Sequence, residues 1–218
     1  MEIQNQIVAS GANTTTAFGW VMIACLGMGL AASSGLNTFL PLLMLSIAAK
    51  YSLFGIHLGG SYEWLVSDAA LGVLALATFF EVIADKIPAV DHFLDTFGII
   101  ARPTAGTLAA ASVIPGLDPV VATMLGLVIG APVALSFHAV KAGTRTMSTA
   151  TTLGMGNPIL SMLEDAFAFF LVIVSFLLPI LAPIAVVAAG LILWRLVKKV
   201  QGWSDRGNEP LKEPNGTL

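Results

Sequence analysis

The sequence has 218 residues, of which 56% are hydrophobic and 11% are charged, with a formal net charge of −3. Soluble domains usually carry about a quarter charged residues, so this composition excludes a water-soluble globular protein. Runs without any charged residue extend over 3–49, 119–140 and 166–194. Each run exceeds the roughly 20 residues that a helix needs to cross a bilayer. The chain is therefore predicted to be an integral membrane protein.

Six transmembrane helices are predicted, because the apolar runs lack the short alternating segments of a membrane β-barrel. The first run is too long for one upright helix, and the polar stretch Ser33–Asn37 interrupts it shortly before Pro41. We expect a broken first helix there, whose non-ideal segment lines a polar interior. The third span is the weakest, since Arg102-Pro103 lies inside it. The predicted spans cover 17–49, 64–84, 97–113, 120–140, 158–178 and a last stretch that ends at Trp194.

The predicted domain organisation is a polar N-terminal segment over 1–16, one helical membrane domain over 17–200 and a disordered cytoplasmic tail over 201–218. Six spans place both termini on one side of the membrane. The positive-inside rule makes that side the cytoplasm, because only Lys50 would lie opposite. The basic residues on the cytoplasmic side would be Lys86, Lys141, Arg145, Arg195, Lys198 and Lys199.

A weak internal repeat relates the two halves of the membrane domain, 17–115 and 118–200. The stretch from Gly29 to Asn37 can be aligned with the stretch from Gly130 to His138, since both contain small residues and end in a polar side chain. Three spans per half would give the halves opposite orientations, which is the inverted-repeat plan of many transporters.

Charged and polar side chains interrupt the apolar pattern at four places. An ionised group at the centre of a bilayer costs about 2.5 kcal/mol or more unless it is paired, hydrated or next to a cavity. Glu81 and Asp85 are four residues apart, so their carboxylates share one face of a helix. This first place continues after Pro88 with Asp91, His92 and Asp95. The other three are Arg102 in the third span, His138, Lys141 and Arg145 at the end of the fourth, and Asn157, Glu164 and Asp165 in the fifth.

Arg102 is expected to contact at least one of four carboxylates, directly or through one water, because apolar sequence surrounds it. These carboxylates are those of Glu81, Asp85, Glu164 and Asp165. Alternatively, such a buried ion pair could have a purely structural role in helix assembly. The alternative for Lys86, Asp91 and Asp95 is a solvated cytoplasmic loop.

Carboxylates and one imidazole also allow a metal site. Hard oxygen donors suit Mg²⁺ or Mn²⁺ better than Zn²⁺, but no spacing here is a specific metal motif, so no cofactor is assigned and a divalent cation remains an alternative. No basic, aromatic-rich surface for nucleic acid is present. The donors of this alternative site are Glu81, Asp85, Asp91, His92 and Asp95.

Five stretches, taken in order, resemble a bacterial membrane-protein family known as the domain of unknown function family 4126. They are AASSGLNTFLPLLMLSIAAKY from Ala31, FFEVIADKIPAVDHFLDTF from Phe79, ARPTAGTLAAAS from Ala101, SFHAVKAGTR from Ser136 and GNPILSMLEDAF from Gly156. The resemblance implies a multi-pass protein of the bacterial inner membrane and brings no established activity. It supports as motif positions Asn37, Glu81, Asp85, Lys86, Asp91, His92, Arg102, His138, Lys141, Arg145, Asn157, Glu164 and Asp165.

The favoured hypothesis is a small secondary transporter, or a flippase for a lipid or an anion. Lysine and arginine would receive an anionic group, and carboxylates or histidine would relay protons. One alternative is a membrane-embedded, metal-dependent enzyme acting on a lipid or polyprenyl substrate. Another is a structural or partner subunit of a membrane complex. The expected partners are the bilayer and an unknown small molecule, ion or lipid, and a homo-oligomer is compatible with this hypothesis.

Overall fold

The computed structural model describes residues 2–184, 186–188 and 191, without the side chains of 2–16, 88–89 and 91–93. The described residues form helices and no strand, which confirms the all-α prediction. The chain divides into a unit over Met1–Val186 and a second over Val187–Leu218, and most of the second, with the predicted tail, lies outside the described residues. The elements of the first unit are α1 (Glu2–Leu36), α2 (Leu40–Lys50), η1 (Leu53–Gly55), η2 (Gly60–Val66), α3 (Asp68–Ala84), α4 (Pro88–Ser112), α5 (Pro119–Thr152) and α6 (Asn157–Leu177).

Three of the described helices are long and apolar enough to cross a membrane. They are the 17–36 part of α1, α5 and α6. η2 and α3 together would make a fourth span, bent by 65° between its two parts, or a re-entrant loop. The outward side chains of α3, α5 and α6 include Val73, Val128 and Phe170, which are 67%, 71% and 61% exposed. Large apolar side chains in such number belong in contact with lipid, so the chain is a membrane protein.

The helix break predicted in the first span is present, but it begins at Asn37, the last residue of the stretch Ser33–Asn37 where it was expected. Ser33 to Leu36 are still helical, and the break comprises Asn37, Thr38 and Phe39. The position follows from Pro41, since its ring would clash with the carbonyl of Asn37 in a continuous helix and it lacks an N–H to donate. The small residues before the break serve close packing instead: a Cβ on Gly35 would lie 2.2 Å from the carbonyl oxygen of Ala134.

Two stretches outside the predicted spans are helical. α5 continues 12 residues beyond the predicted end of the fourth span at Val140, and Lys141 and Arg145 lie on its buried face at 1% and 2% exposure. α4 begins at Pro88, a favourable first residue for a helix, so Asp95 is helical. Lys141 and Arg145 are therefore buried helical residues, and the side of the membrane on which they lie stays a prediction.

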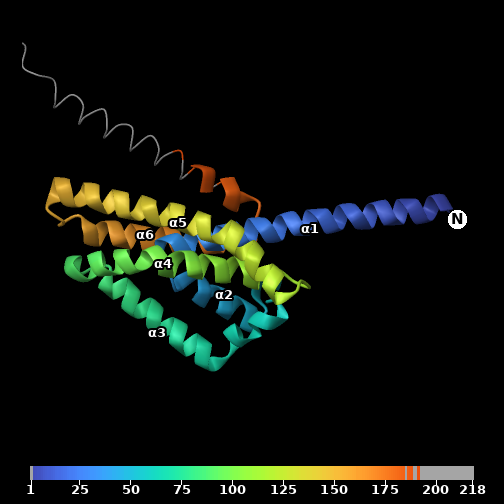
Figure 1. The fold of residues 1–218 in the computed structure, drawn as a ribbon, viewed down its shortest axis with the longest axis horizontal. Coiled ribbons are helices and arrows are strands. Elements are labelled where there is room, and N and C mark those ends of the chain that lie inside the picture. The colour runs from blue at the N-terminus through green and yellow to red at the C-terminus, as the bar shows by residue number, and fades with distance from the viewer. Residues whose placement is uncertain (1, 185, 189–190, 192–218) are drawn as a thin grey trace, which may run out of the picture. The chain divides into compact units, whose positions relative to one another are not determined.

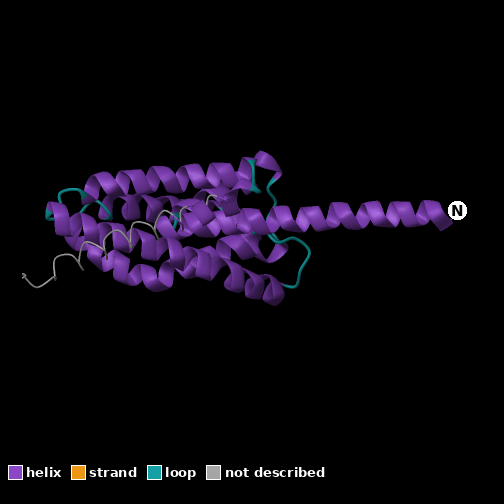
Figure 2. Cartoon of the chain, turned by 90° about the horizontal axis from the view of Figure 1, so that it is seen from above, coloured by secondary structure: helices purple, strands orange, loops and turns teal. Residues whose placement is uncertain are grey.

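α1, α4, α5 and α6 lie side by side as a bundle, while α3 diverges from α4 beyond the turn that joins them (Figure 1). Figure 2 shows the same bundle from above. α4 and α5 approach closely through glycines: a Cβ on Gly130 would lie 2.3 Å from the carbonyl oxygen of Gly106, and one on Gly126 would lie 2.6 Å from that of Thr107. Small residues four apart allow such close contact between membrane helices, and this contact brings the charges of α4 and α5 next to α1.

Gly130→Ala and Gly143→Ala should change stability in opposite directions. A methyl group at Gly130 forces α4 and α5 apart and should destabilise the fold by about 1–3 kcal/mol. Gly143, on the same helix, has open space where its Cβ would be. Alanine there removes backbone entropy from the unfolded chain and should stabilise by about 0.5–1 kcal/mol. Thermal unfolding of both variants in one detergent measures the difference, and equal melting temperatures would contradict the packing described.

Candidate functional site

The broken helix α1–α2 forms the centre of the candidate site. Asn37 and Thr38 are 0% and 6% exposed, so the backbone groups of the break are shielded from both water and lipid. A helix end leaves several N–H or C=O groups without an intrahelical partner, and burying such a group without a hydrogen bond is costly. The backbone N–H and C=O groups of the break must therefore form hydrogen bonds with residues of other helices.

Glu81 of α3 receives the N–H groups at the start of α2. Thr38 donates to Glu81 Oε1 from its backbone nitrogen and from its hydroxyl, each at 2.8 Å, and Phe39 N donates to Oε2 at 3.1 Å. The side chain of Asn37 completes this end, since its Oδ1 accepts from Leu40 N at 3.1 Å. A carboxylate is favoured here because the N-terminus of a helix carries a partial positive charge.

Two cations bind the carbonyls at the end of α1. Arg102 of α4 donates from Nη1 to the Gly35 oxygen at 3.2 Å. Lys141 of α5 donates from Nζ to the Leu36 oxygen at 2.9 Å. Both side chains are 1% exposed. The end of α1 carries partial negative charge, so each side of the break meets side chains of the opposite sign.

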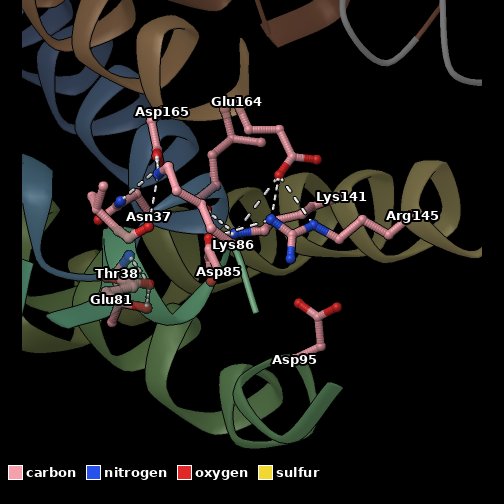
Figure 3. Close-up of polar contacts among 12 residues, drawn as sticks. Asn37, Thr38, Glu81, Asp85, Lys86, Asp95, Lys141, Arg145, Glu164 and Asp165 are labelled. Carbon is pink, nitrogen blue, oxygen red and sulfur yellow. Dashed lines mark hydrogen bonds and ion pairs between the residues drawn. The ribbon is translucent and has the colours of Figure 1, made fainter. Parts of the chain in front are cut away.

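Lys141 also belongs to a cluster of four buried charges with Asp85, Arg145 and Glu164. Lys141 Nζ lies 2.5 Å from Asp85 Oδ2 and 3.8 Å from Glu164 Oε2. Arg145 Nη2 lies 3.3 Å from Asp85 Oδ2 and 2.8 Å from Glu164 Oε2. Figure 3 shows Glu164 linked to both cations. Two cations and two anions give no formal net charge, which lowers the cost of burying them together.

A more open pair lies beside this cluster. Lys86 Nζ is 3.4 Å from Asp165 Oδ2, and the two side chains are 34% and 17% exposed. Asp165 also accepts from Asn37 Nδ2 at 3.1 Å. Asn37 therefore uses its amide oxygen within the break and its amide nitrogen toward α6 (Figure 3).

The carboxylate that pairs with Arg102 is that of Asp95, with Nη2 3.7 Å from Oδ1. Arg102 Nη1 also lies 2.7 Å from His138 Nδ1. The expected direct contact with Glu81, Asp85, Glu164 or Asp165 was wrong, and a contact through one water stays a prediction. Asp95 is seven residues before Arg102, two helical turns away on the same face of α4. That spacing was the sequence signal that could have identified the partner.

Asn157 and Ser161 extend the buried polar face of α6 away from Glu164. Asn157 donates from Nδ2 to Thr149 Oγ1 at 3.0 Å. Neither Ser161, which is fully buried, nor Thr38 had been selected from the sequence as a site residue, because single hydroxyl residues are common in membrane helices. Among the described residues, the buried atoms without a hydrogen-bond partner include Asp85 Oδ1, Arg102 Nε, Asn157 Oδ1 and Ser161 Oγ. Such atoms usually bind water or a ligand.

The structure brings most predicted residues together and leaves two undescribed. Asp91 and His92 belong to α4, but their side chains lie outside the described set. Among the described residues, no group of three or more histidine, cysteine, aspartate or glutamate side chains is arranged to hold a metal ion. Lysine and arginine occupy the positions between the clustered carboxylates, where a bound cation would be repelled.

The fold and the site define a multi-spanning helical membrane protein with a charged, buried helix break. The chain belongs to the family described as Domain of unknown function (DUF4126), whose model matches residues 24–199. This match confirms the resemblance found in the sequence. No curated protein and no solved structure matches the chain.

A double-mutant cycle on Arg145 and Glu164 should show strong coupling. Arg145→Met leaves excess negative charge buried, which should destabilise the fold by about 3–5 kcal/mol. Adding Glu164→Gln restores charge balance and should recover part of this loss, giving a coupling energy of about 1.5 kcal/mol or more. The free energies of unfolding of the wild type, the two single variants and the double variant in detergent give this coupling energy.

The control cycle uses the surface ion pair of Lys50 and Asp68, whose side chains are 25% and 98% exposed. Lys50→Met and Asp68→Asn should show little coupling, because solvent screens exposed charges. Additive losses at Arg145 and Glu164, as in the control, would show that the buried charges do not act as a unit.

Proposed function

We propose that this protein is a small secondary transporter, or a flippase for a lipid or an anion, in the bacterial inner membrane. The observation that carries the proposal is the buried helix break at Asn37–Phe39. Its two backbone ends are bound by Glu81, Arg102 and Lys141, which come from three other helices. Discontinuous helices with charged partners are the structures from which many transporters build their substrate sites.

The contacts of the break offer groups that a substrate could exchange. Lys141 binds both a backbone carbonyl and Asp85, and Arg102 binds a carbonyl, His138 and Asp95. An anionic substrate group could replace one of these acceptors while the cation keeps the others. The cations therefore suit anion binding, and the neighbouring carboxylates and His138 suit proton transfer. Ionisable groups inside a membrane bundle commonly mark such pathways.

Six spans arranged as a 3+3 inverted repeat belong to this proposal. Asn37 and His138, which end the two aligned stretches, are both buried beside the charged break, at 0% and 4% exposure. Their joint position supports an alignment of the two halves across one polar interior. The sixth span lies mostly outside the described residues.

The transport proposal predicts a variant that folds but does not transport. In proteoliposomes, the wild-type chain should scramble fluorescent phosphatidylglycerol or release a trapped anion. Arg145→Met/Glu164→Gln keeps the cluster charge-balanced but removes a cation and a carboxylate that lie next to Lys141 and Asp85, so transport should fall at least tenfold. Lys50→Met/Asp68→Asn should retain full transport. Full activity in the first double variant would assign the cluster to stability alone, and an inactive wild type that co-purifies with a partner would favour a structural subunit.

Both termini are proposed to lie in the cytoplasm, because Arg195, Lys198 and Lys199 follow the last apolar run and basic residues are enriched on the cytoplasmic side of membrane helices. A reporter that is active only in the cytoplasm should be active when fused after Leu218. A reporter inserted within 51–62 should behave as periplasmic. A periplasmic result for the C-terminal fusion would overturn this topology.

A further inference from the structure

A cavity of about 230 Å³ lies between α3, α4 and the helix break. Pockets that enclose a whole small molecule usually measure about 300–1,000 Å³, so this cavity has room for only part of a larger ligand. Most of its wall is apolar, with Ala77, Phe80, Ala84, Leu94, Phe97 and Ala101.

The sides of the cavity carry exposed aromatic side chains. Phe80 on α3 and Phe97 on α4 line it and are 58% and 59% exposed. Aromatic side chains with this exposure on membrane helices contact hydrocarbon chains. A ligand that fits this wall is therefore a hydrocarbon chain whose remainder stays in the bilayer.

The inner wall of the cavity is polar. Thr38 and Glu81 lie on it, but three donors of the break already occupy the Glu81 carboxylate. Gly98 also lines the cavity, and a Cβ on Gly98 would lie 3.1 Å from Arg102 Nε. That Nε is buried and has no protein acceptor. The group left unpaired behind this wall is thus a cationic donor.

We propose that this cavity binds one hydrocarbon chain of an anionic membrane lipid, whose headgroup is directed to Arg102 past Gly98. The inference rests on the proposed transport function and names its substrate class. The apolar wall favours the hydrocarbon chain of the lipid. The unpaired guanidinium nitrogen selects an acceptor group such as a phosphate oxygen. Glycine at position 98 is required because any side chain there would contact the Arg102 guanidinium and block the approach of the headgroup.

The test uses nanodiscs that contain phosphatidylglycerol with a photoactivatable diazirine on one acyl chain. Crosslinks mapped by mass spectrometry should fall on the cavity wall, at Phe80, Leu94 or Phe97. Ala77→Phe fills the cavity and should reduce these crosslinks at least fivefold. Its control is Leu76→Phe, because Leu76 is the preceding residue of α3, is 58% exposed and does not line the cavity. Ala84→Leu serves as a second blocking variant if Ala77→Phe lowers the melting temperature.

Two further arms test the headgroup. The same labelled chain on phosphatidylcholine should crosslink at least threefold less than on phosphatidylglycerol, and excess inorganic phosphate should leave the phosphatidylglycerol crosslinks unchanged. Equal crosslinking by both lipids, equal crosslinking in both position-76 and position-77 variants, or loss of crosslinks with phosphate would overturn the inference. Lipid binding without any transport would instead overturn the proposed function and leave this inference standing.

Discussion

The structure depends on one constraint, which is that the backbone groups of a helix break cannot stay unpaired inside a membrane protein. Pro41 makes the break at Asn37–Phe39 unavoidable. The N–H groups that the break leaves without an intrahelical partner then require an acceptor, which Glu81 provides. The carbonyls left in the same way require donors, which Arg102 and Lys141 provide. The signs of these three side chains follow from the direction of the helix dipoles on either side of the break.

The rest of the charged interior follows from these three residues. Lys141 is a buried cation and needs a counter-charge, which Asp85 supplies. One turn further along α5, Arg145 shares Asp85 and brings in Glu164 from α6. The close approach of α4 and α5 at Gly106 and Gly130 keeps the cations near α1. The glycine contact and the charge network therefore support one another.

Composition and spacing predicted the helical membrane fold, the broken first helix and the residues that gather around it. Those features follow from local rules: apolar length, proline chemistry and the cost of isolated charge. The partner of Arg102 was not predicted because Asp95, seven residues earlier, lies before the predicted start of the third span, so the helical face that the two residues share was not considered. A loop stayed open as the alternative for Asp95, because Pro88 can either begin or end a helix and the sequence around it allowed both. The extension of α5 to Thr152 was missed for a similar reason, since its polar residues face a charged interior that only the assembled bundle creates.

The central claim is that Glu81 holds the backbone of the break, and hydrogen exchange at Thr38 and Phe39 tests it most directly. Glu81→Gln keeps the shape of the side chain but removes its charge and one acceptor, so the two amides should lose protection. Their exchange in detergent or nanodiscs should become at least tenfold faster than in wild type. Glu63→Gln, at an exposed position, should leave it unchanged. Unchanged protection of Thr38 and Phe39 in Glu81→Gln would contradict the claim.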